Sequence, residues 1–223
     1  MKKLACLILT ALLTLSFALA ETAFVTISDD QGKIVVANEP FDVTDADGDG
    51  VVSISDALFA AHEAKFEGGA EAGYEAGDVG YGLSLLRLWG IDNGSSYGYY
   101  VNNAMPMSLA DPIADGDLVN AYAFTDLETW SDTYSYFDIA RAVNSGELTL
   151  TLNAIMFDAD FNPVATPVEG AVITIDGEST EFVTDANGCV TITLGDAEEY
   201  LISAVSDTIT LVPPVCIVSG SAR

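Results

Sequence analysis

From Leu148 onward the sequence is divided into short, closely spaced segments of apolar and β-branched residues, with no helical pattern between them. These segments are separated by turns of Asp, Asn, Gly and Pro, and they read LTLTLNAIMF, GAVITID, EFVT, CVTITL, YLISAV and TITLVP. That spacing of strands and turns is typical of a small β-sandwich. We therefore predict an all-β domain over residues 147–223.

The part of the chain before that domain has a different pattern. Two β-branched runs, at residues 22–28 and 33–37, flank a turn rich in Asp and Gly, which predicts a β-hairpin. A helical pattern follows at 55–66, then a loop rich in Gly, Ala and Glu at 67–82, and then strand patterns at 83–89, 97–101 and 118–124. This order predicts an α+β domain over residues 21–146, with the helix laid on a mixed sheet.

An acidic segment lies between the hairpin and the helix, at residues 45–56 (DADGDGVVSISD). Its spacing fits the twelve-position EF-hand loop, in which carboxylates at positions 1, 3 and 5 converge on one cation and a glycine at position 6 permits a sharp turn. The alternative is a solvated acidic turn at a helix N-terminus, where the helix dipole favours carboxylates without any metal. The predicted calcium ligands are Asp45, Asp47, Asp49, the carbonyl oxygen of Val51, Ser53 and Asp56.

Asp56 closes this loop with a shorter side chain than the glutamate usual at position 12, so we expect modest affinity. An extracellular module would suit a dissociation constant on the order of 10⁻⁴ to 10⁻³ M. Dockerin repeats also close the loop with Asp, and DADGDGVVSISDAL resembles such a repeat. The resemblance implies calcium binding. Dockerins carry two repeats, whereas this sequence has one, so it does not extend to a docking partner.

Three short motifs follow in order along the first domain: LWG at 88–90, YGYYVNN at 97–103 and DGDLV at 115–119. Together with the hairpin and the helix, they resemble the β-grasp domain at the C-terminal end of transcobalamin-type proteins. The resemblance covers roughly residues 22–124 and implies a β-grasp fold and binding of a small ligand such as a corrinoid. The chain departs from that family by placing the calcium loop ahead of the helix and by lacking the large helical domain that forms half of the corrinoid site.

Aromatic residues in the same region are candidates for ligand binding. Tyr97 and Tyr99 would share one face of their strand, with Tyr100 on the other. With Trp89, Tyr97 and Tyr99 could form a platform for a sugar or a protein partner. Ordinary packing within the sheet explains the same pattern, and the sequence leaves both interpretations open.

The predicted sandwich carries a resemblance of its own. PVEGAVITI at 167–175, TDANG at 184–188 and YLISA at 200–204 resemble bacterial immunoglobulin-like or transthyretin-like repeat domains, which implies that Asp185 lies in a hairpin turn. DADFN at 158–162 has Pro163 where a calcium loop needs glycine, so we interpret it as a turn. In an oxidising compartment Cys189 and Cys216 would form a disulfide, and two buried thiols are the alternative.

The first 20 residues have the pattern of a secretory signal peptide. Lys2 and Lys3 precede an apolar run, and Ala18-Leu19-Ala20 forms a small-residue cleavage site before Glu21. No later segment is apolar over a length that spans a bilayer, so we expect a secreted or cell-surface protein without a membrane anchor. Without residues 1–20, five basic residues face 34 acidic ones, a formal net charge of −29. That charge disfavours nucleic acid and anionic lipid as partners and suits multivalent cations.

The sequence offers little for catalysis. His62 is the only histidine, no G-x-S-x-G motif is present, and the cysteines suit a bridge better than nucleophilic attack. The favoured hypothesis is an exported, non-catalytic binding or adhesion module with calcium as a structural ion and an extracellular protein or glycan as its partner. A small-ligand binding protein, for a corrinoid-like molecule or a glycan, is the first alternative. A carboxylate-dependent hydrolase is the second, because carboxylate pairs are too numerous to exclude a dyad by counting.

Overall fold

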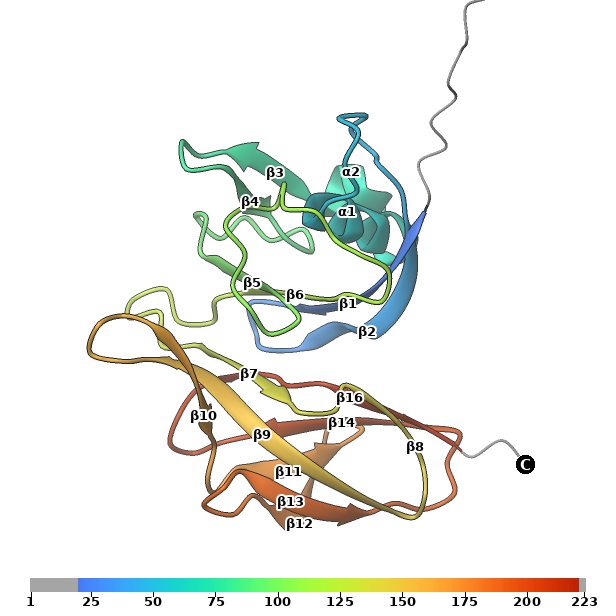
Figure 1. The fold of residues 1–223 in the computed structure, drawn as a ribbon, viewed down its shortest axis with the longest axis vertical. Helices are drawn as coiled ribbons and strands as arrows, with labels where there is room; N and C mark the ends of the chain where they lie inside the picture. The colour runs from blue at the N-terminus through green and yellow to red at the C-terminus, as the bar shows by residue number, and fades with distance from the viewer. Residues whose placement is uncertain (1–19, 221–223) are drawn as a thin grey trace, which may run out of the picture.

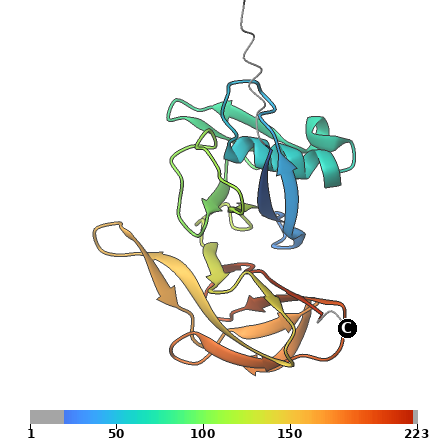
Figure 2. The same ribbon diagram turned by 45° about the vertical axis from the view of Figure 1, so that its right-hand side comes forward.

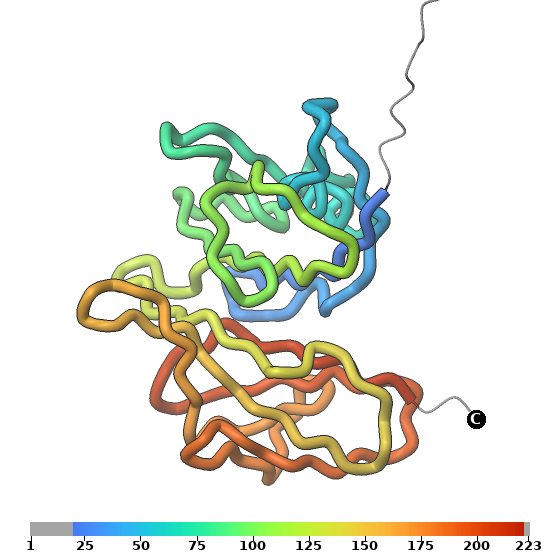
Figure 3. Tube along the Cα trace, viewed as in Figure 1, coloured from blue at the N-terminus to red at the C-terminus, as the bar shows by residue number. Residues whose placement is uncertain are grey.

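The computed structural model describes residues 20–220, which form two bodies stacked along the long axis of the molecule (Figure 1). Residues 21–123 form the first body and residues 133–219 the second, and the chain passes between them once (Figure 3). The predicted signal peptide lies outside the described residues, except for Ala20. Neither of the two helices in the described part has the length and apolar character needed to cross a membrane.

The first body is organised around a four-stranded sheet of order β2-β1-β6-β5. β1 pairs antiparallel with β2 and parallel with β6, and β6 pairs antiparallel with β5. The predicted hairpin is confirmed, although its second strand is longer than the sequence pattern indicated. The bounds of the four strands are β1 (Glu21–Ser28), β2 (Ile34–Val43), β5 (Tyr97–Val101) and β6 (Leu118–Ala123).

Helix α1 (Ile54–Lys65) packs against this sheet (Figure 2). Its buried side chains recur at intervals of three and four residues, so they form one stripe that faces the strands. Ser53 caps its first turn in a capping box with Asp56. The helix predicted at residues 55–66 is therefore confirmed to within one residue at each end. The stripe contains Ile54, Ala57, Leu58, Ala61 and His62.

The segment predicted as a loop at residues 67–82 is structured. It contains α2 (Gly69–Gly73) and β3 (Glu75–Asp78), and β3 pairs with β4 (Leu83–Arg87) in a two-stranded sheet. The Phe66 ring lies so close to Gly73 that a Cβ there would come within 2.6 Å of it. Gly73, part of the composition that predicted a loop, permits close packing against an aromatic ring.

The second body consists of two five-stranded sheets that share one core. The first sheet contains β7 (Thr133–Phe137), β9 (Glu147–Phe157), β10 (Pro163–Pro167), β13 (Cys189–Thr193) and β15 (Leu211–Val212). The second contains β8 (Arg141–Val143), β11 (Val172–Ile175), β12 (Glu178–Val183), β14 (Glu199–Val205) and β16 (Cys216–Ser219). Leu152 and Ile192 from one sheet and Ile173 and Ile202 from the other are fully buried between them. This part of the chain is all β, as its strand spacing predicted.

The α+β class predicted for the whole chain is wrong. The described chain has 47% strand, 8% helix, only two helices and four sheets, which makes it an all-β fold. The prediction gave too much weight to α1 and missed four short strands, β3, β7, β8 and β10. These strands have three to five residues each, too few for a convincing alternation of buried and exposed positions. They form because a neighbouring strand supplies hydrogen-bond partners, and a local sequence pattern does not reveal that neighbour.

The boundary between the two bodies also lies earlier than the predicted position at residues 146–147. β7 and β8 fall inside the predicted first domain, yet they pair with β9 and β16 of the second body. The connection is therefore the segment 124–132. The aromatic stretch that begins at Trp130 and ends at Phe137 leads into the second body and provides its first strand.

An aromatic cluster joins the two bodies where the outer face of the first sheet meets the second body. The rings of Tyr100 and Tyr134 stack with their centroids 3.7 Å apart and their planes 5° apart. The Tyr134 hydroxyl donates a hydrogen bond of 2.9 Å to Asn103 Oδ1. Tyr122 lies beside them over Gly98, its cross-strand partner, where any Cβ would come within 2.2 Å of the tyrosine ring. Gly98 thus leaves room for an aromatic ring at the contact between the bodies.

Hydrogen bonds complete this contact. The Arg141 guanidinium donates to the Asn38 carbonyl oxygen at 2.6 Å and lies over the Phe24 ring, 5.0 Å from its centroid. The Asn38 side-chain amide donates to the Ala140 carbonyl oxygen at 2.9 Å. Directional bonds added to stacked rings fix the orientation of one body on the other.

Candidate metal centre

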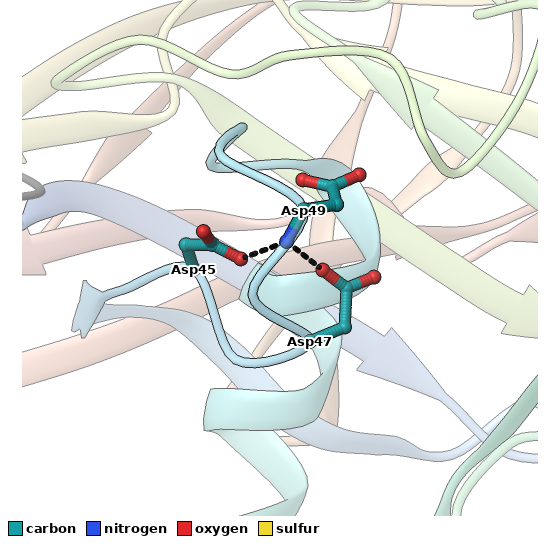
Figure 4. Close-up of side chains that lie close together, drawn as sticks. All are labelled: Asp45, Asp47 and Asp49. Carbon is teal, nitrogen blue, oxygen red and sulfur yellow. Dashed lines mark hydrogen bonds between the residues drawn. The ribbon is translucent and has the colours of Figure 1, made fainter.

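The acidic loop connects β2 to α1 at the end of the first body that points away from the second (Figure 1). Asp45, Asp47 and Asp49 each offer a carboxylate oxygen, and these oxygens all lie within 4.8 Å of one another. Figure 4 shows the three side chains gathered along one short turn of the chain. The structure therefore brings together the first, third and fifth positions of the predicted loop. No other group of three His, Cys, Asp or Glu side chains comes this close in residues 20–220.

Backbone N–H groups hold these carboxylates in place. Asp45 accepts hydrogen bonds from the N–H groups of Gly48 and Gly50, at 2.7 and 2.8 Å. The Asp49 N–H is shared between Asp45 Oδ1 at 3.2 Å and Asp47 Oδ1 at 3.1 Å (Figure 4). Asp49 in turn accepts from the Val51 N–H at 2.8 Å. The loop is thus wound around its own carboxylates.

Gly50 permits this winding. Its φ angle of 93° lies in the left-handed region, where a residue with a Cβ is strained. The sixth position of a calcium loop needs that conformation, because the chain must turn sharply to bring later ligands back to the same point. The role predicted for this glycine agrees with its backbone angle.

The pKa values of neighbouring carboxyl groups in the loop move in opposite directions. Hydrogen bonds from loop N–H groups, that of Gly50 above all, lower the pKa of Asp45. The Asp49 N–H also acts to lower the pKa of Asp47, but desolvation and the charges of Asp49 and Asp56 outweigh it, so the pKa of Asp47 is raised. Such a divergence is expected where like charges are crowded together. A divalent cation among these oxygens would favour the ionised form of each.

Asp56 has a structural role that the sequence did not indicate. Its side chain is buried, and its Oδ1 accepts the Ala46 N–H at 2.9 Å. Its Oδ2 accepts the N–H and the hydroxyl of Ser53, at 2.8 and 2.7 Å. It is not part of the group of three whose oxygens lie within 4.8 Å. With these three donors, Asp56 connects the start of the loop to the start of α1, and its predicted place as the twelfth-position ligand stays a prediction.

The two remaining predicted ligands also differ from each other. The Ser53 hydroxyl donates to Asp56 Oδ2 and accepts the Asp56 N–H at the helix start. The Val51 carbonyl oxygen accepts no hydrogen bond within residues 20–220, which leaves its lone pairs available to a cation. The Val51 carbonyl oxygen is thus free to act as a ligand, whereas the Ser53 hydroxyl also caps the helix and its predicted ligand role stays a prediction.

The exit of the loop is anchored to a distant segment that the sequence did not indicate. The Val52 carbonyl oxygen accepts the Ile113 N–H at 3.0 Å, and the Ile54 N–H donates to the Asp111 carbonyl oxygen at 3.1 Å. Ser53 and Pro112 form an isolated antiparallel bridge between these bonds. The exit of the loop is therefore fixed to the body of the protein, while its acidic turn is exposed.

This arrangement suits a hard cation. All of the atoms available to bind a metal are oxygens, from three carboxylates and one carbonyl group. Calcium and magnesium prefer oxygen ligands in proteins. An exposed loop with adjustable side chains fits the variable coordination of Ca²⁺ better than the strict octahedron of Mg²⁺. Waters would have to complete the shell, which agrees with the modest affinity expected from the sequence.

The candidate ligand-binding aromatic residues lie against the core of the first body. Tyr97, Tyr99 and Trp89 are all partly buried and pack on it. The Tyr97 hydroxyl donates to the Ile91 carbonyl oxygen at 2.6 Å and accepts the Asn93 N–H at 2.7 Å. These contacts support the packing interpretation over an open platform. Tyr100, on the opposite face of the same strand, instead contacts the second body.

The predicted disulfide is not formed, because both cysteines are free. Cys189 lies on β13 opposite Thr151 of β9, and its sulfur is 3.6 Å from the Thr151 hydroxyl oxygen. Cys216 lies on β16 and is fully buried in the core between the sheets. Alternation along the strand places Val190 inward and its neighbour Cys189 outward, so the Cys189 sulfur points away from the core that contains Cys216.

His62 is a structural residue. It is fully buried, its Nδ1 donates to the Leu58 carbonyl oxygen at 2.6 Å, and its Nε2 accepts the Trp89 N–H at 2.9 Å. Burial lowers the pKa of this imidazole to about 4, so it is neutral near pH 7. Both ring nitrogens are occupied by backbone groups, which leaves neither free for acid–base chemistry.

Comparison of the chain with protein-family models, with curated proteins and with solved structures finds no match.

Proposed function

We propose that this chain is an exported, non-catalytic binding module stabilised by calcium. The observation that carries the proposal is the convergence of Asp45, Asp47 and Asp49, with carboxylate oxygens within 4.8 Å in a loop turned by Gly50. Three like charges at this spacing repel one another, and a divalent cation converts that repulsion into attraction. The strongly acidic composition, with 34 Asp and Glu against seven Lys and Arg, supports a cation as partner.

Calcium would act on stability through the start of α1. The loop that holds the three carboxylates leads directly to the capping box formed by Ser53 and Asp56. Ile54 and Leu58, one turn further on, are fully buried in the core of the first body. A cation that orders the loop would therefore reduce fraying at the helix start and stabilise the packing beneath it.

Binding without catalysis is supported by the state of the only histidine and of the buried cysteine. His62 is neutral, buried and bonded at both nitrogens. The Cys216 thiol is buried in the core, and burial raises its pKa to about 12, which removes it as a thiolate nucleophile at neutral pH. A partner outside the cytoplasm, such as a protein or a glycan, fits a module whose leader sequence predicts export.

Thermal unfolding with and without calcium tests the proposal. With a dissociation constant near 1 mM, about 10 mM Ca²⁺ stabilises the folded state by about 1.4 kcal/mol. For a chain of this size the melting temperature should rise by about 3–6 °C. Asp45→Asn combined with Asp49→Asn keeps the size of both side chains, removes two of the charges and should abolish the rise.

A matched control removes the same charge elsewhere. Asp160→Asn combined with Glu181→Gln changes two exposed carboxylates of the second body and should leave the calcium-dependent rise intact. A wild-type melting curve that calcium does not shift would refute the calcium part of the proposal. An equal loss of the response in both double variants would show that calcium acts through general charge screening and not through the loop.

A further inference from the structure

A cavity of about 560 Å³ lies between the two bodies. The β1–β2 turn, with Gly32, Lys33 and Ile34, forms one side, and β11, β14 and the segment 206–213 form the other. Figures 1 and 2 both show this turn directed toward the second body. The volume falls in the range of small-molecule sites, and such sites are common where two domains meet.

Apolar side chains form most of the walls. Ile34 comes from the first body, Leu201 and Val205 from β14, and Ile209 and Leu211 from the segment after it. Val205 is 52% exposed, which is high for an aliphatic side chain on a regular strand. A ligand with an apolar body would remove these surfaces from water, and that is the usual driving force for filling such a cavity.

Two hydroxyl groups on the cavity wall have no partner. Thr174 and Ser203 lie directly opposite each other on β11 and β14, and both side chains line the cavity. Neither side-chain oxygen takes part in a hydrogen bond within residues 20–220, although the two residues are only 7% and 8% exposed. Within that range, the only fully enclosed side-chain oxygen or nitrogen without a partner is Asn38 Oδ1, so these hydroxyls face accessible space. That space is the cavity, where they are available to a ligand.

Lys33 supplies a positive charge at the mouth of the same cavity. In the described part of the chain, Lys65 pairs with Glu39 and Arg87 with Asp92, while Arg141 bonds to the Asn38 carbonyl oxygen. Lys33 is exposed, lines the cavity and has no ion pair within residues 20–220.

The acidic side chain that also lines the cavity is not paired with Lys33. Asp176 also lines the cavity, but in residues 20–220 it forms no ion pair with Lys33, and its carboxylate is held toward β14 by the Leu201 N–H at 2.9 Å. A lone cation in a chain of formal charge −27 can hold one negative charge, whereas the surrounding field opposes a polyanion.

We infer that this cavity is a binding site for a small amphipathic monocarboxylic acid. The apolar body of the ligand lies against Ile34, Leu201 and Val205, and its carboxylate lies at Lys33. A polar group along the body, such as a hydroxyl or an amide, meets the hydroxyls of Thr174 and Ser203. Both bodies contribute to the site, so the ligand also strengthens their contact.

This inference goes beyond the proposed calcium function and is independent of it. The carboxylate cluster lies at the end of the first body that points away from the second, whereas the cavity lies at the junction of the bodies (Figure 1). Ligand binding should therefore persist in the Asp45→Asn and Asp49→Asn double variant and in the presence of EDTA. That measurement separates failure of one proposal from failure of the other.

Fluorescence titration with dansyl-aminoundecanoic acid, compared with its uncharged methyl ester, tests the inference. The full chain should bind the acid more tightly than the ester. Lys33→Gln should weaken binding of the acid by about fivefold, as expected for an exposed ion pair, and leave the ester unchanged. Lys65→Gln is the matched control: it makes the same substitution at a lysine paired with Glu39 and should change neither affinity.

A second variant tests the location of the site. Val205→Trp places an indole ring at a partly exposed position on the cavity wall and should abolish binding of both probes without lowering the melting temperature. The inference is overturned if the wild type binds neither probe, or if it binds the acid and the ester equally well. It is also overturned if Lys33→Gln and Lys65→Gln behave alike, or if a folded Val205→Trp variant binds as the wild type does.

Discussion

Two acidic turns, one in each body, begin with the same Asp-Ala-Asp sequence and have different structures. At residues 45–49 three carboxylates converge, with a left-handed Gly50 behind them. At residues 158–162 a single carboxylate takes the bonds of its own turn: Asp158 Oδ1 accepts the N–H groups of Asp160 and Asn162 at 2.9 and 2.8 Å. The Asn162 side chain also donates to Asp158, and these bonds from Asn162 lower the pKa of Asp158.

The difference shows that acidic composition is not enough to build a cation site. The second turn has Pro163 where the first has Gly50, and the chain enters β10 there instead of winding further. No helix follows the second turn, and its carboxylates do not form a group of three. Convergence of carboxylates therefore depends on backbone freedom at one position and on a helix start that anchors the exit of the loop.

The two bodies differ, as the two turns do, in whether they combine helices with a carboxylate cluster. Both described helices, the only histidine and the carboxylate cluster belong to the first body, whereas the second consists of strands joined by turns. Calcium, and protonation of the histidine in mild acid, should therefore act directly on the first body, and the second should respond through the contact between them. The following predictions address that difference.

Loss of the interdomain stack should have the largest effect. Tyr134→Ala removes a buried ring that lies 3.7 Å from Tyr100, together with the hydrogen bond to Asn103. Truncation of a buried aromatic side chain costs about 3–5 kcal/mol. We expect calorimetry to resolve two unfolding transitions in the variant, of which calcium shifts only one. Tyr81→Ala, at a residue that is 95% exposed, is the control and should leave a single transition.

Mild acid should destabilise the first body through His62. Burial lowers the pKa of this side chain from 6.5 to about 4 in the folded protein. Between these values the unfolded chain binds a proton that the folded chain does not, so stability falls as pH falls below 6.5. The loss between pH 7 and pH 5 should be about 2 kcal/mol, measured by urea unfolding with EDTA present. His62→Gln should flatten this dependence, and an unchanged slope in that variant would contradict the assignment.

Substitution of Asp56 should have a smaller effect and should sharpen the description of the loop. Asp56→Asn weakens the capping box, and loss of a helix cap costs about 0.5–2 kcal/mol. If Asp56 acts by connecting the loop to the helix, the loss of stability is the same in EDTA and in saturating calcium. A loss that is clearly larger in calcium would show that Asp56 also coordinates the ion. The comparison needs only two melting curves for each protein.

Local sequence patterns predicted the elements whose signals repeat over several residues. The hairpin at the start of the first body, helix α1 and the long strands of the second body were all anticipated, because each shows a period of two or of about 3.6 over five or more residues. The winding of the loop at residues 45–50 was also predictable, because Gly50 is the residue type that accepts a left-handed conformation without strain. The short strands β3, β8 and β10 were missed because their hydrogen-bond partners are distant in sequence or their faces are exposed on both sides.

The sequence by itself determined where three carboxylates could meet, because the spacing of Asp45, Asp47 and Asp49 and the glycine after them act within one turn of the chain. Only the tertiary structure decided the rest. It buried Asp56 against Ser53, placed Cys216 in the core of the sandwich and Cys189 away from it, and brought Lys33 to the outer faces of β11 and β14. The physical reason is range: backbone angles and helix caps depend on neighbours in sequence, whereas burial, disulfide geometry and cavities depend on which distant strands pack together.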